Sequence, residues 1–300
     1  MTALFPGFEP VESDDGGVRV RALAGGSGPP VLLLHGYPQT RAMWHRVAPS
    51  LARDHTVIVA DLRGYGDSDK PEDTPGAGTY AKRAMAADQV ILMRSLGFTR
   101  FAVAGHDRGG RVAHRMALDF PERVHALAVL DIVPTLHMFE NVDRAMASSY
   151  FHWFFLSQGS GLPERMILAD HQAWLRSRFA GRHAGAWPFD ERAMAEYERC
   201  FDEAAIRASC ADYRAAAGID LDHDRADRAD RDLVRVPVLA LWGAHSYVGR
   251  NFDVTAVWRE YAEQVEGVAV PADHYVCEEA PAEVIEALSG FCRPRDGSDS

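Results

Sequence analysis

The chain has 300 residues, of which 47% are hydrophobic, and this is enough to bury a large core in one α/β domain with an insertion or in two domains. Its formal net charge of −11 argues against nucleic acid or an anionic membrane as the main partner. No stretch approaches the roughly 18 consecutive apolar residues that a transmembrane helix needs.

Apolar runs alternate with helical patterns along the first part of the chain. Residues 1–30 alternate weakly and are interrupted by pairs of glycines, which predicts a hairpin at the edge of a sheet. Continuous apolar runs predict buried strands at Val31–His35, Val57–Asp61, Phe101–Ala104 and Ala126–Leu130. Helical spacing predicts helices over Trp44–Leu51, Tyr80–Leu96 and Arg111–Leu118.

The pattern changes near residue 134, where runs typical of strands stop and aromatic residues become frequent in helical segments. The alternation resumes with strands at Val238–Trp242 and Val268–Val270 and helices over Phe252–Glu263 and Pro281–Phe291. We therefore expect an α/β fold with a mainly parallel sheet, helices on both faces and a helical cap. The expected core comprises residues 1–133 and 233–300, and the cap residues 134–232, ending in an Asp/Arg-rich connector, Asp220–Asp232, exposed to solvent.

A sharp turn separates the strand at Phe101–Ala104 from the helix that follows it. Residues 105–109, Gly-His-Asp-Arg-Gly, fit the G-x-S-x-G nucleophile elbow, in which the central side chain projects from the end of a strand. Asp107 holds the central position, and an ionised carboxylate can attack a substrate without first losing a proton. The alternative is that Asp107 only caps the helix.

Two arginines, Arg108 and Arg111, follow Asp107 on one face of the predicted helix. A helix N-terminus attracts anions, and each guanidinium adds a planar set of hydrogen-bond donors. This arrangement predicts an anionic substrate. The alternative is that both arginines pair with carboxylates at the protein surface.

An ester formed on Asp107 must be hydrolysed by water, which requires a base. His274 follows the last predicted strand and fits the order nucleophile, acid, histidine that is typical of the α/β-hydrolase fold. Asp131, at the end of the strand Ala126–Leu130, can orient this histidine, although a loop or capping aspartate is the alternative. Gly36 and Tyr37 follow the first buried strand, where backbone N–H groups commonly form an oxyanion hole, although a glycine needed only for the turn would look the same.

The sequence from His35-Gly-Tyr-Pro-Gln39 to His274 resembles the fluoroacetate dehalogenases of the α/β-hydrolase superfamily. The most specific part of this resemblance is His106-Asp-Arg-Gly-Gly-Arg-Val-Ala-His-Arg-Met-Ala-Leu118, because related haloalkane dehalogenases and epoxide hydrolases usually carry Trp after the aspartate. The resemblance implies that Asp107 is the nucleophile, His274 the base and Asp131 its partner. Arg108 and Arg111 would then bind the substrate carboxylate.

The resemblance also implies a halide site, formed by His152, Trp153 and Tyr213 in the cap. Without the resemblance, the aromatic run around His152 would be equally consistent with a hydrophobic core. The chain departs from the family pattern near Phe179–His183, where Arg182 lies closest to the position of a bulky tryptophan that narrows the pocket. This departure makes the substrate size and the preference for fluoride open questions.

The predicted reaction is hydrolytic dehalogenation of a small 2-halocarboxylate such as fluoroacetate, without a metal or organic cofactor. One alternative is an epoxide hydrolase, with Tyr213 and either Tyr150 or Tyr197 protonating the opening ring. A second is a non-catalytic receptor for small acids on the same fold. The paired arginines and the joint presence of Asp107, Asp131 and His274 favour the dehalogenase.

The four cysteines show neither C-x-x-C nor zinc spacing, and the N-terminus lacks the pattern of a secretory signal. We therefore expect a reduced, cytoplasmic protein. The expected partner is a small haloacid anion, with no role for nucleic acid or a membrane. The resemblance further suggests a homodimer.

Overall fold

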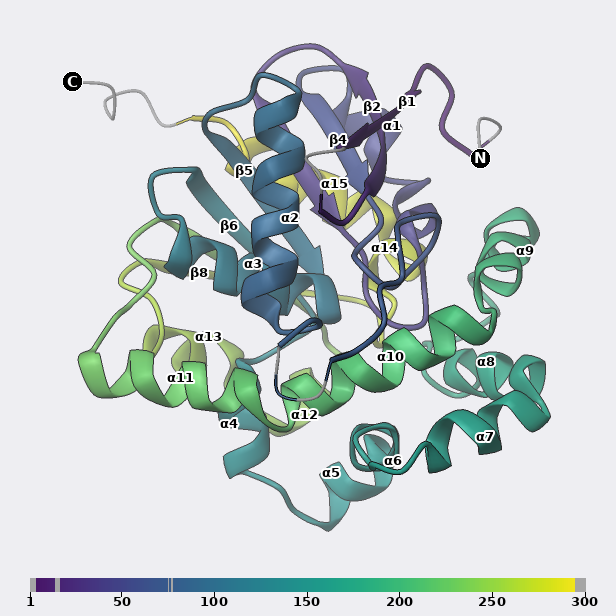
Figure 1. Ribbon diagram of the computed structural model, residues 1–300. Coiled ribbons are helices and arrows are strands. Elements are labelled where there is room, and N and C mark those ends of the chain that lie inside the picture. The colour runs from purple at the N-terminus through teal and green to yellow at the C-terminus, as the bar shows by residue number, and fades with distance from the viewer. Residues whose placement is uncertain (1–3, 14–16, 75, 77, 295–300) are drawn as a thin grey trace.

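The computed structural model describes residues 4–13, 17–74, 76 and 78–294 and contains one eight-stranded sheet (Figure 1). The strand order is β1-β2-β4-β3-β5-β6-β7-β8. All neighbouring strands from β4 to β8 run parallel, whereas β1 and β2 are antiparallel to their neighbours. The predicted α/β fold with a mainly parallel sheet is therefore confirmed.

The strands agree closely with the apolar runs in the sequence. The hairpin expected near the N-terminus is formed by β1 (Glu9–Ser13) and β2 (Val20–Gly26), with β1 at the sheet edge. The remaining strands are β3 (Pro30–Leu34), β4 (Thr56–Ala60), β5 (Phe101–His106), β6 (Val124–Leu130), β7 (Val238–Gly243) and β8 (Val265–Val270). All residues of β5 are buried, as expected for a central strand covered on both faces.

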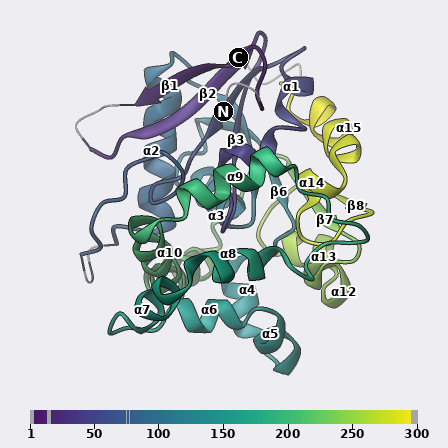
Figure 2. The same cartoon turned by 90° about the vertical axis from the view of Figure 1, so that its right-hand side faces the viewer.

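Helices cover both faces of the sheet. The helices α2 (Lys82–Ser95) and α3 (Arg108–Asp119) lie on one face, whereas α1 (Ala48–Leu51) and α15 (Pro281–Phe291) lie on the other (Figures 1 and 2). Three further core helices follow β7 and β8: α12 (Tyr247–Asn251), α13 (Val254–Arg259) and α14 (Val276–Glu279).

Two predicted helices differ from the observed ones. The segment Trp44–Leu51 is divided between a 3₁₀ helix at Arg41–Trp44 and α1, which carries a proline in its first turn. The segment Phe252–Glu263 contains only α13, because the Asp253 side chain caps it by accepting a hydrogen bond from the Ala256 N–H.

Eight helices lie between β6 and β7 and are called the cap helices below. They gather beyond one end of the sheet, at the bottom of Figures 1 and 2. They are α4 (Thr135–Glu140), α5 (Arg144–Ser149), α6 (Phe151–Leu156), α7 (Leu162–Ala169), α8 (His171–Phe179), α9 (Glu191–Cys200), α10 (Glu203–Ala216) and α11 (Ile219–Asp230).

The segment Asp220–Asp232, predicted to be a solvated connector, is exposed at more than half of its residues, but most of it forms the helix α11. Its acidic residues pair with the core: Arg115 of α3 forms ion pairs with Asp224 and Asp227 at 2.8 and 2.5 Å. Arg228 also pairs with Glu140 of α4 at 2.6 Å. The charges therefore attach this helix to its neighbours, which the composition alone did not indicate.

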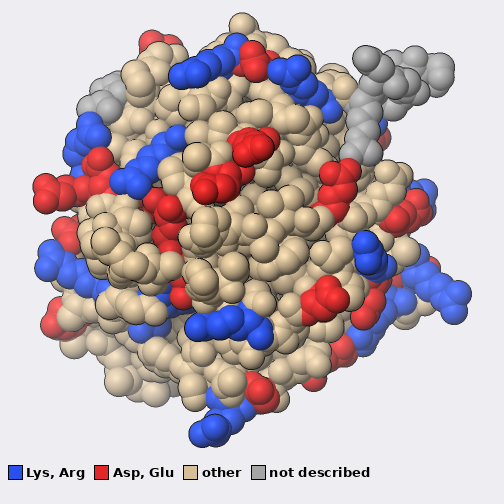
Figure 3. Space-filling model, turned by 180° about the vertical axis from the view of Figure 1, so that it is seen from behind, with Lys and Arg blue, Asp and Glu red and all other residues tan. Residues whose placement is uncertain are grey.

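Positive and negative side chains are interspersed on the face of the molecule opposite to that of Figure 1 (Figure 3). Within the described ranges, no helix combines the length and the hydrophobicity required to cross a bilayer. The four cysteines are all buried and unpaired.

Candidate active site

Asp107 lies in the turn between β5 and α3, which the sequence pattern predicts to be a nucleophile elbow. Its backbone has φ of 46° and ψ of −112°, a conformation that costs energy for any residue except glycine. Gly105 makes the turn possible, because a Cβ atom there would lie 2.3 Å from the Gly109 carbonyl oxygen. Asp107 occupies the N-cap position of α3, but its carboxylate makes no capping hydrogen bond.

The residues after β3 touch the Asp107 carboxylate directly. The backbone N–H of Tyr37 donates a hydrogen bond to Asp107 Oδ2 at 3.1 Å. Gly36 leaves room for this contact, since a Cβ atom there would lie 2.5 Å from Asp107 Cβ. Gly36 and Tyr37 therefore lie beside the carboxylate, where the motif predicts an oxyanion hole.

Asp107 is only 5% exposed. Burial acts to raise its pKa, but the electrostatic interactions with His274, which are the largest, and with the neighbouring His106 and arginines outweigh burial and hold the pKa below its usual value. The Asp107 carboxylate is therefore ionised at neutral pH, although almost no water reaches it. A desolvated, ionised carboxylate is suited to nucleophilic attack.

His274 and Asp131 form a buried hydrogen-bonded pair. His274 Nδ1 lies 2.7 Å from Asp131 Oδ2, and the Gly243 N–H donates to Asp131 Oδ1 at 3.1 Å. Burial lowers the pKa of His274 well below its ordinary value, and the charge of Arg182 lowers it further. The imidazole is therefore neutral at neutral pH and able to accept a proton. Burial raises the pKa of Asp131 to about 6, so this carboxylate is mostly ionised at neutral pH.

Arg111 is buried and lies against the cap aromatic residues. Its Nη1 donates to the Val133 carbonyl oxygen at 3.1 Å and to Thr135 Oγ1 at 3.0 Å. Its guanidinium carbon lies 4.6 Å from the centre of the Trp153 ring. Burial lowers the pKa of Arg111 to about 10, which leaves it charged at neutral pH. No carboxylate forms an ion pair with this guanidinium among the described residues.

Arg108 differs from Arg111, because a carboxylate from the cap already engages it. Its Nε donates to Asp212 Oδ2 at 2.9 Å, and its Nη2 donates to the Asp212 carbonyl oxygen at 3.0 Å. Asp212 lies on α10, and Lys82 at the start of α2 forms an ion pair with the same carboxylate. Only Nη1 of Arg108 lacks a hydrogen-bond partner within the described part of the chain.

Asp212 is therefore the main site residue that the sequence analysis missed. It is fully buried, and its pKa lies below the ordinary value because Arg108 and Lys82 outweigh the effect of burial. A carboxylate beside Tyr213, within an alanine-rich helix, is the only signal in the sequence that could have indicated it.

The three predicted halide ligands lie together next to the two arginines. Tyr213 lies 5.8 Å from His152 and 6.2 Å from Trp153 between ring centres, and the Arg108 guanidinium stacks over the Tyr213 ring at 4.3 Å. Trp153 Nε1 and His152 Nδ1 are buried without hydrogen-bond partners in the described ranges. Buried donors without partners are rare in folded proteins and indicate room for a ligand or water.

Arg182, the departure from the family pattern, lies in the turn after α8 near the same site. Its guanidinium carbon is 5.1 Å from the centre of the Tyr150 ring, which in turn stacks with His152 at 5.7 Å. After burial, Arg182 is also the largest influence on the lowered pKa of His152. A cation therefore stands at the edge of the predicted substrate site.

The alternative proton donors for an epoxide lie at different places. Tyr150 packs against Trp153, with ring centres 5.6 Å apart, and therefore lies close to the predicted halide ligands. Tyr197 instead donates a hydrogen bond to Glu278 at 2.6 Å. Tyr150 is consequently the better partner for Tyr213 in that alternative.

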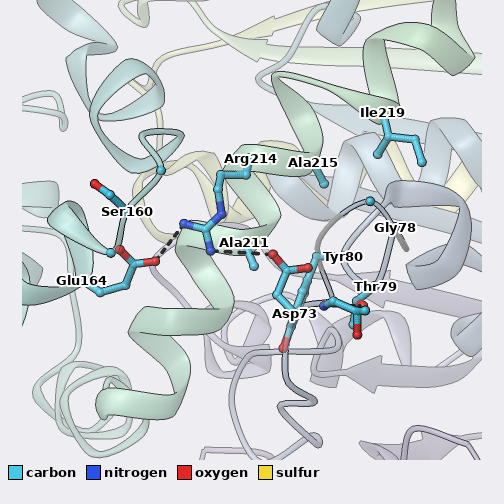
Figure 4. A pocket seen from close by; sticks show the side chains of 14 residues that line it. Asp73, Gly78, Thr79, Tyr80, Ser160, Glu164, Ala211, Arg214, Ala215 and Ile219 are labelled. Atoms are coloured by element: carbon cyan, nitrogen blue, oxygen red, sulfur yellow. Dashed lines mark hydrogen bonds and ion pairs between the residues drawn. The ribbon is translucent and has the colours of Figure 1, made fainter.

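Two other places were considered for ligands or metals. A cavity of about 520 Å³ between α10 and the loop before α2 contains Arg214, which is already paired with Glu164 at 2.8 Å and Asp73 at 3.7 Å (Figure 4). Asp67, Glu196 and Cys200 bring three possible metal ligands together, but Arg199 pairs with both carboxylates.

Comparison with known proteins agrees with this geometry. Residues 29–281 match the model of the α/β-hydrolase fold family. The chain is 45% identical to a fluoroacetate dehalogenase from Burkholderia sp over 96% of its length and 95% of that protein. It is also 36% identical to a soluble epoxide hydrolase from Corynebacterium sp. (strain C12), over 93% of this chain and 95% of that one.

Solved structures show the same relationship. A protein from Nostoc sp PCC 7120, described only at the level of an α/β-hydrolase, has a TM-score of 0.92 and 48% identity over 95% of this chain and 97% of its own. The epoxide hydrolase CorEH has a TM-score of 0.86 and 33% identity over 95% of this chain and 98% of its own. This chain is a hydrolase that belongs to the fluoroacetate dehalogenase family of α/β-hydrolases.

Proposed function

We propose that the protein hydrolyses the carbon–halogen bond of a small 2-halocarboxylate, with Asp107 as nucleophile. One observation carries this proposal: an ionised, buried Asp107 lies beside a group of polar atoms that lack partners among the described residues. These atoms are Arg108 Nη1, Arg111 Nε, His152 Nδ1 and Trp153 Nε1. An anion with a halogen on the adjacent carbon would satisfy both the arginines and the cap donors.

In the first step, Arg108 and Arg111 bind the substrate carboxylate and hold the α-carbon in line with Asp107. The Asp107 oxygen forms a bond to this carbon as the carbon–halogen bond breaks, and the halogen leaves with the bonding electron pair. Such alignment can lower the barrier by several kcal/mol, which matters for a substrate with few other groups to bind. His152, Trp153 and Tyr213 stabilise the departing halide.

In the second step, neutral His274 takes a proton from water, and the resulting hydroxide attacks the carbonyl carbon of the Asp107 ester. Asp131 orients the imidazole and stabilises its protonated form. The Tyr37 N–H lies beside this carboxyl group and stabilises the oxyanion. The ester then releases the 2-hydroxy acid, restores the Asp107 carboxylate, and His274 returns its proton to solvent.

An epoxide hydrolase is the second candidate, and the position of Tyr150 near Tyr213 favours it, as does the similarity to the Corynebacterium epoxide hydrolase. An uncharged epoxide would leave the buried charge of Arg111 without a counterpart in the ligand, at a cost in free energy. The arginines therefore favour the haloacid.

The test is to measure halide release from fluoro-, chloro- and bromoacetate, and from their 2-methyl and 2-phenyl analogues, alongside diol formation from small epoxides. We expect halide from the small haloacids. Diol formation without halide release would support the epoxide hydrolase, and neither product over several hours would support the non-catalytic receptor. The homodimer and the cytoplasmic location stay predictions, and light scattering after size-exclusion chromatography measures the former.

A further inference from the structure

Arg182 lies at a boundary between the candidate active site and a second cavity. This cavity has a volume of about 230 Å³ and is lined by Tyr150, Arg182, Arg250 and Asp273, among others. Tyr150 also stacks on His152, and Asp273 directly precedes His274. The cavity therefore adjoins both the cap side and the core side of the catalytic residues.

The Arg182 guanidinium has no carboxylate partner within 4 Å among the described residues. Its guanidinium carbon lies over the Tyr150 ring, 5.1 Å from the ring centre. Arg214, in the cavity between α10 and the loop before α2, provides a contrast, because two carboxylates pair with it (Figure 4). Arg182 is only partly buried, so its donors remain accessible to a ligand in the cavity.

A second cation without a carboxylate partner lies one helical turn earlier. Arg178, near the end of α8, stacks over Trp174 at 4.5 Å and Phe151 at 4.7 Å and donates to Ser177 Oγ. Trp174 in turn donates a hydrogen bond from Nε1 to the Tyr37 hydroxyl oxygen at 2.7 Å. Arg178 therefore brings positive charge toward the candidate active site, and no acidic side chain in the described ranges forms an ion pair with it.

The cavity is also too large for the small substrates considered so far. Its volume equals that of roughly eight water molecules, at about 30 Å³ each in the liquid. A haloacetate has only its carboxylate and its halogen as binding groups, so once these are bound it offers no further group to Arg182. A substituent on the α-carbon would extend toward the cavity, where Arg182 and Arg250 outnumber Asp273.

We propose that Arg182 binds a second carboxylate of the substrate, so that the preferred substrates are 2-halodicarboxylates with the second carboxylate on the α-carbon substituent. This proposal rests on the proposed dehalogenase function and specifies its substrate class. Arg108 and Arg111 bind the carboxylate next to the carbon–halogen bond, and Arg182 binds the distal one. A guanidinium suits this role because it offers two parallel donors to a carboxylate.

The test compares 2-chlorosuccinate with 2-chlorobutanoate, which have the same chain length and differ in a distal carboxylate or methyl group. For wild-type protein, kcat/KM should be at least about tenfold higher with chlorosuccinate than with chlorobutanoate. Arg182→Leu should lower kcat/KM for chlorosuccinate by about tenfold or more, mainly through KM, and change that for chlorobutanoate by less than about threefold.

Arg176→Leu is the matched control, since it removes the same charge from α8 at an exposed position paired with Glu198. It should leave both substrates unaffected. Equal losses on both substrates in Arg182→Leu would mean that Arg182 acts on entry or on the shared chemistry, and would overturn the proposal. A wild-type protein without preference for chlorosuccinate would overturn it as well.

Chloroacetate, assayed in parallel, separates this proposal from the proposed function. If the protein releases chloride from chloroacetate but does not prefer chlorosuccinate to chlorobutanoate, the proposed binding of a distal carboxylate by Arg182 is rejected and the proposed function is not. If no haloacid releases halide, the proposed function fails, and binding of the product analogues malate and 2-hydroxybutanoate, measured by calorimetry, decides the distal site. Wild-type protein should bind malate at least about tenfold more tightly than 2-hydroxybutanoate, and Arg182→Leu should bind the two acids equally. Equal binding of the two acids to wild type would overturn the distal site.

Discussion

Two groups of residues meet at the candidate active site, and the protein holds them in different ways. Asp107, Asp131 and His274 all follow the carboxyl ends of parallel strands. Hydrogen bonds from the backbone N–H groups of Tyr37 and Gly243, and the one between His274 and Asp131, hold them in place. His152, Trp153 and Tyr213 come from two cap helices and are positioned mainly by aromatic packing.

This difference suggests a division of work. Under the proposed function, the sheet would fix the groups that attack the substrate and transfer protons, whereas the cap would surround the substrate and select it. Among the contacts between the two halves is a fully buried ion-pair cluster, in which Asp212 of the cap binds Arg108 and Lys82 of the core. The predictions below separate the two halves and then test the junction.

The largest effect is expected from the core half. Asp107→Asn keeps the size of the side chain, and asparagine also tolerates the positive φ, but the uncharged amide is a poor nucleophile. Halide release should fall by on the order of 10⁴-fold or more, without a change in thermal unfolding. Substantial turnover by this variant, after deamidation has been excluded by mass spectrometry, would contradict the role of Asp107.

The junction comes next. Asp212→Asn removes the charge that compensates Arg108 and Lys82 in a fully buried place. The free energy of unfolding should fall by about 3 kcal/mol, which is more than a hundredfold in the unfolding equilibrium. Glu203→Gln on the same helix is the control, because its ion pair with Arg207 is exposed and should contribute less than about 1 kcal/mol. Equal urea midpoints for the two variants would mean that the buried cluster does not join cap and core.

Arg111→Lys tests whether Arg111 binds the substrate carboxylate. Lysine keeps the charge but loses the planar donor set and the stacking on Trp153. We expect kcat/KM for chloroacetate to fall by about a hundredfold, and Arg83→Lys, at an exposed pair with Asp119, to have no effect. Wild-type kinetics in Arg111→Lys would indicate a structural arginine.

The sequence was sufficient to predict most of the core half. Continuous apolar runs indicate the buried strands, and Gly105, two residues before Asp107, indicates the strained turn. Strands and tight turns are both determined largely by neighbouring residues in the chain. The cap was predicted only as helical, and α11 was predicted only as a connector, because its acidic residues pair with Arg115, an arginine of the core that is distant in the sequence.

Asp212 and the position of Arg182 were missed for the same reason. Nothing in the neighbouring residues states that one carboxylate of α10 will lie beside Arg108, or that a turn after α8 will bring a guanidinium over Tyr150. Such contacts between residues far apart in the chain depend on how the cap packs on the sheet, and one sequence does not contain that information in readable form. The catalytic and halide-binding roles stay predictions until they are measured.

The smallest effect is expected from the cap half. A hydrogen bond to a charged acceptor contributes about 1.5 to 3 kcal/mol, so Tyr213→Phe should slow defluorination by about ten- to a hundredfold. Dechlorination should slow far less, because chloride is a weaker hydrogen-bond acceptor than fluoride. Single-turnover rates on fluoroacetate and chloroacetate make this comparison. Equal losses on the two substrates would remove Tyr213 from the halide site.

The central claim is that Asp107 forms an ester which His274 then hydrolyses. In His274→Ala the first step should still proceed and the second should stop, so chloroacetate should convert the protein to a stable adduct on Asp107. Intact-protein mass spectrometry followed by peptide mapping measures this directly. We expect one carboxymethyl group per chain, located on the peptide that contains Asp107 and absent from the Asp107→Asn/His274→Ala double variant. An unmodified His274→Ala protein, under conditions in which wild type releases chloride, would contradict this mechanism.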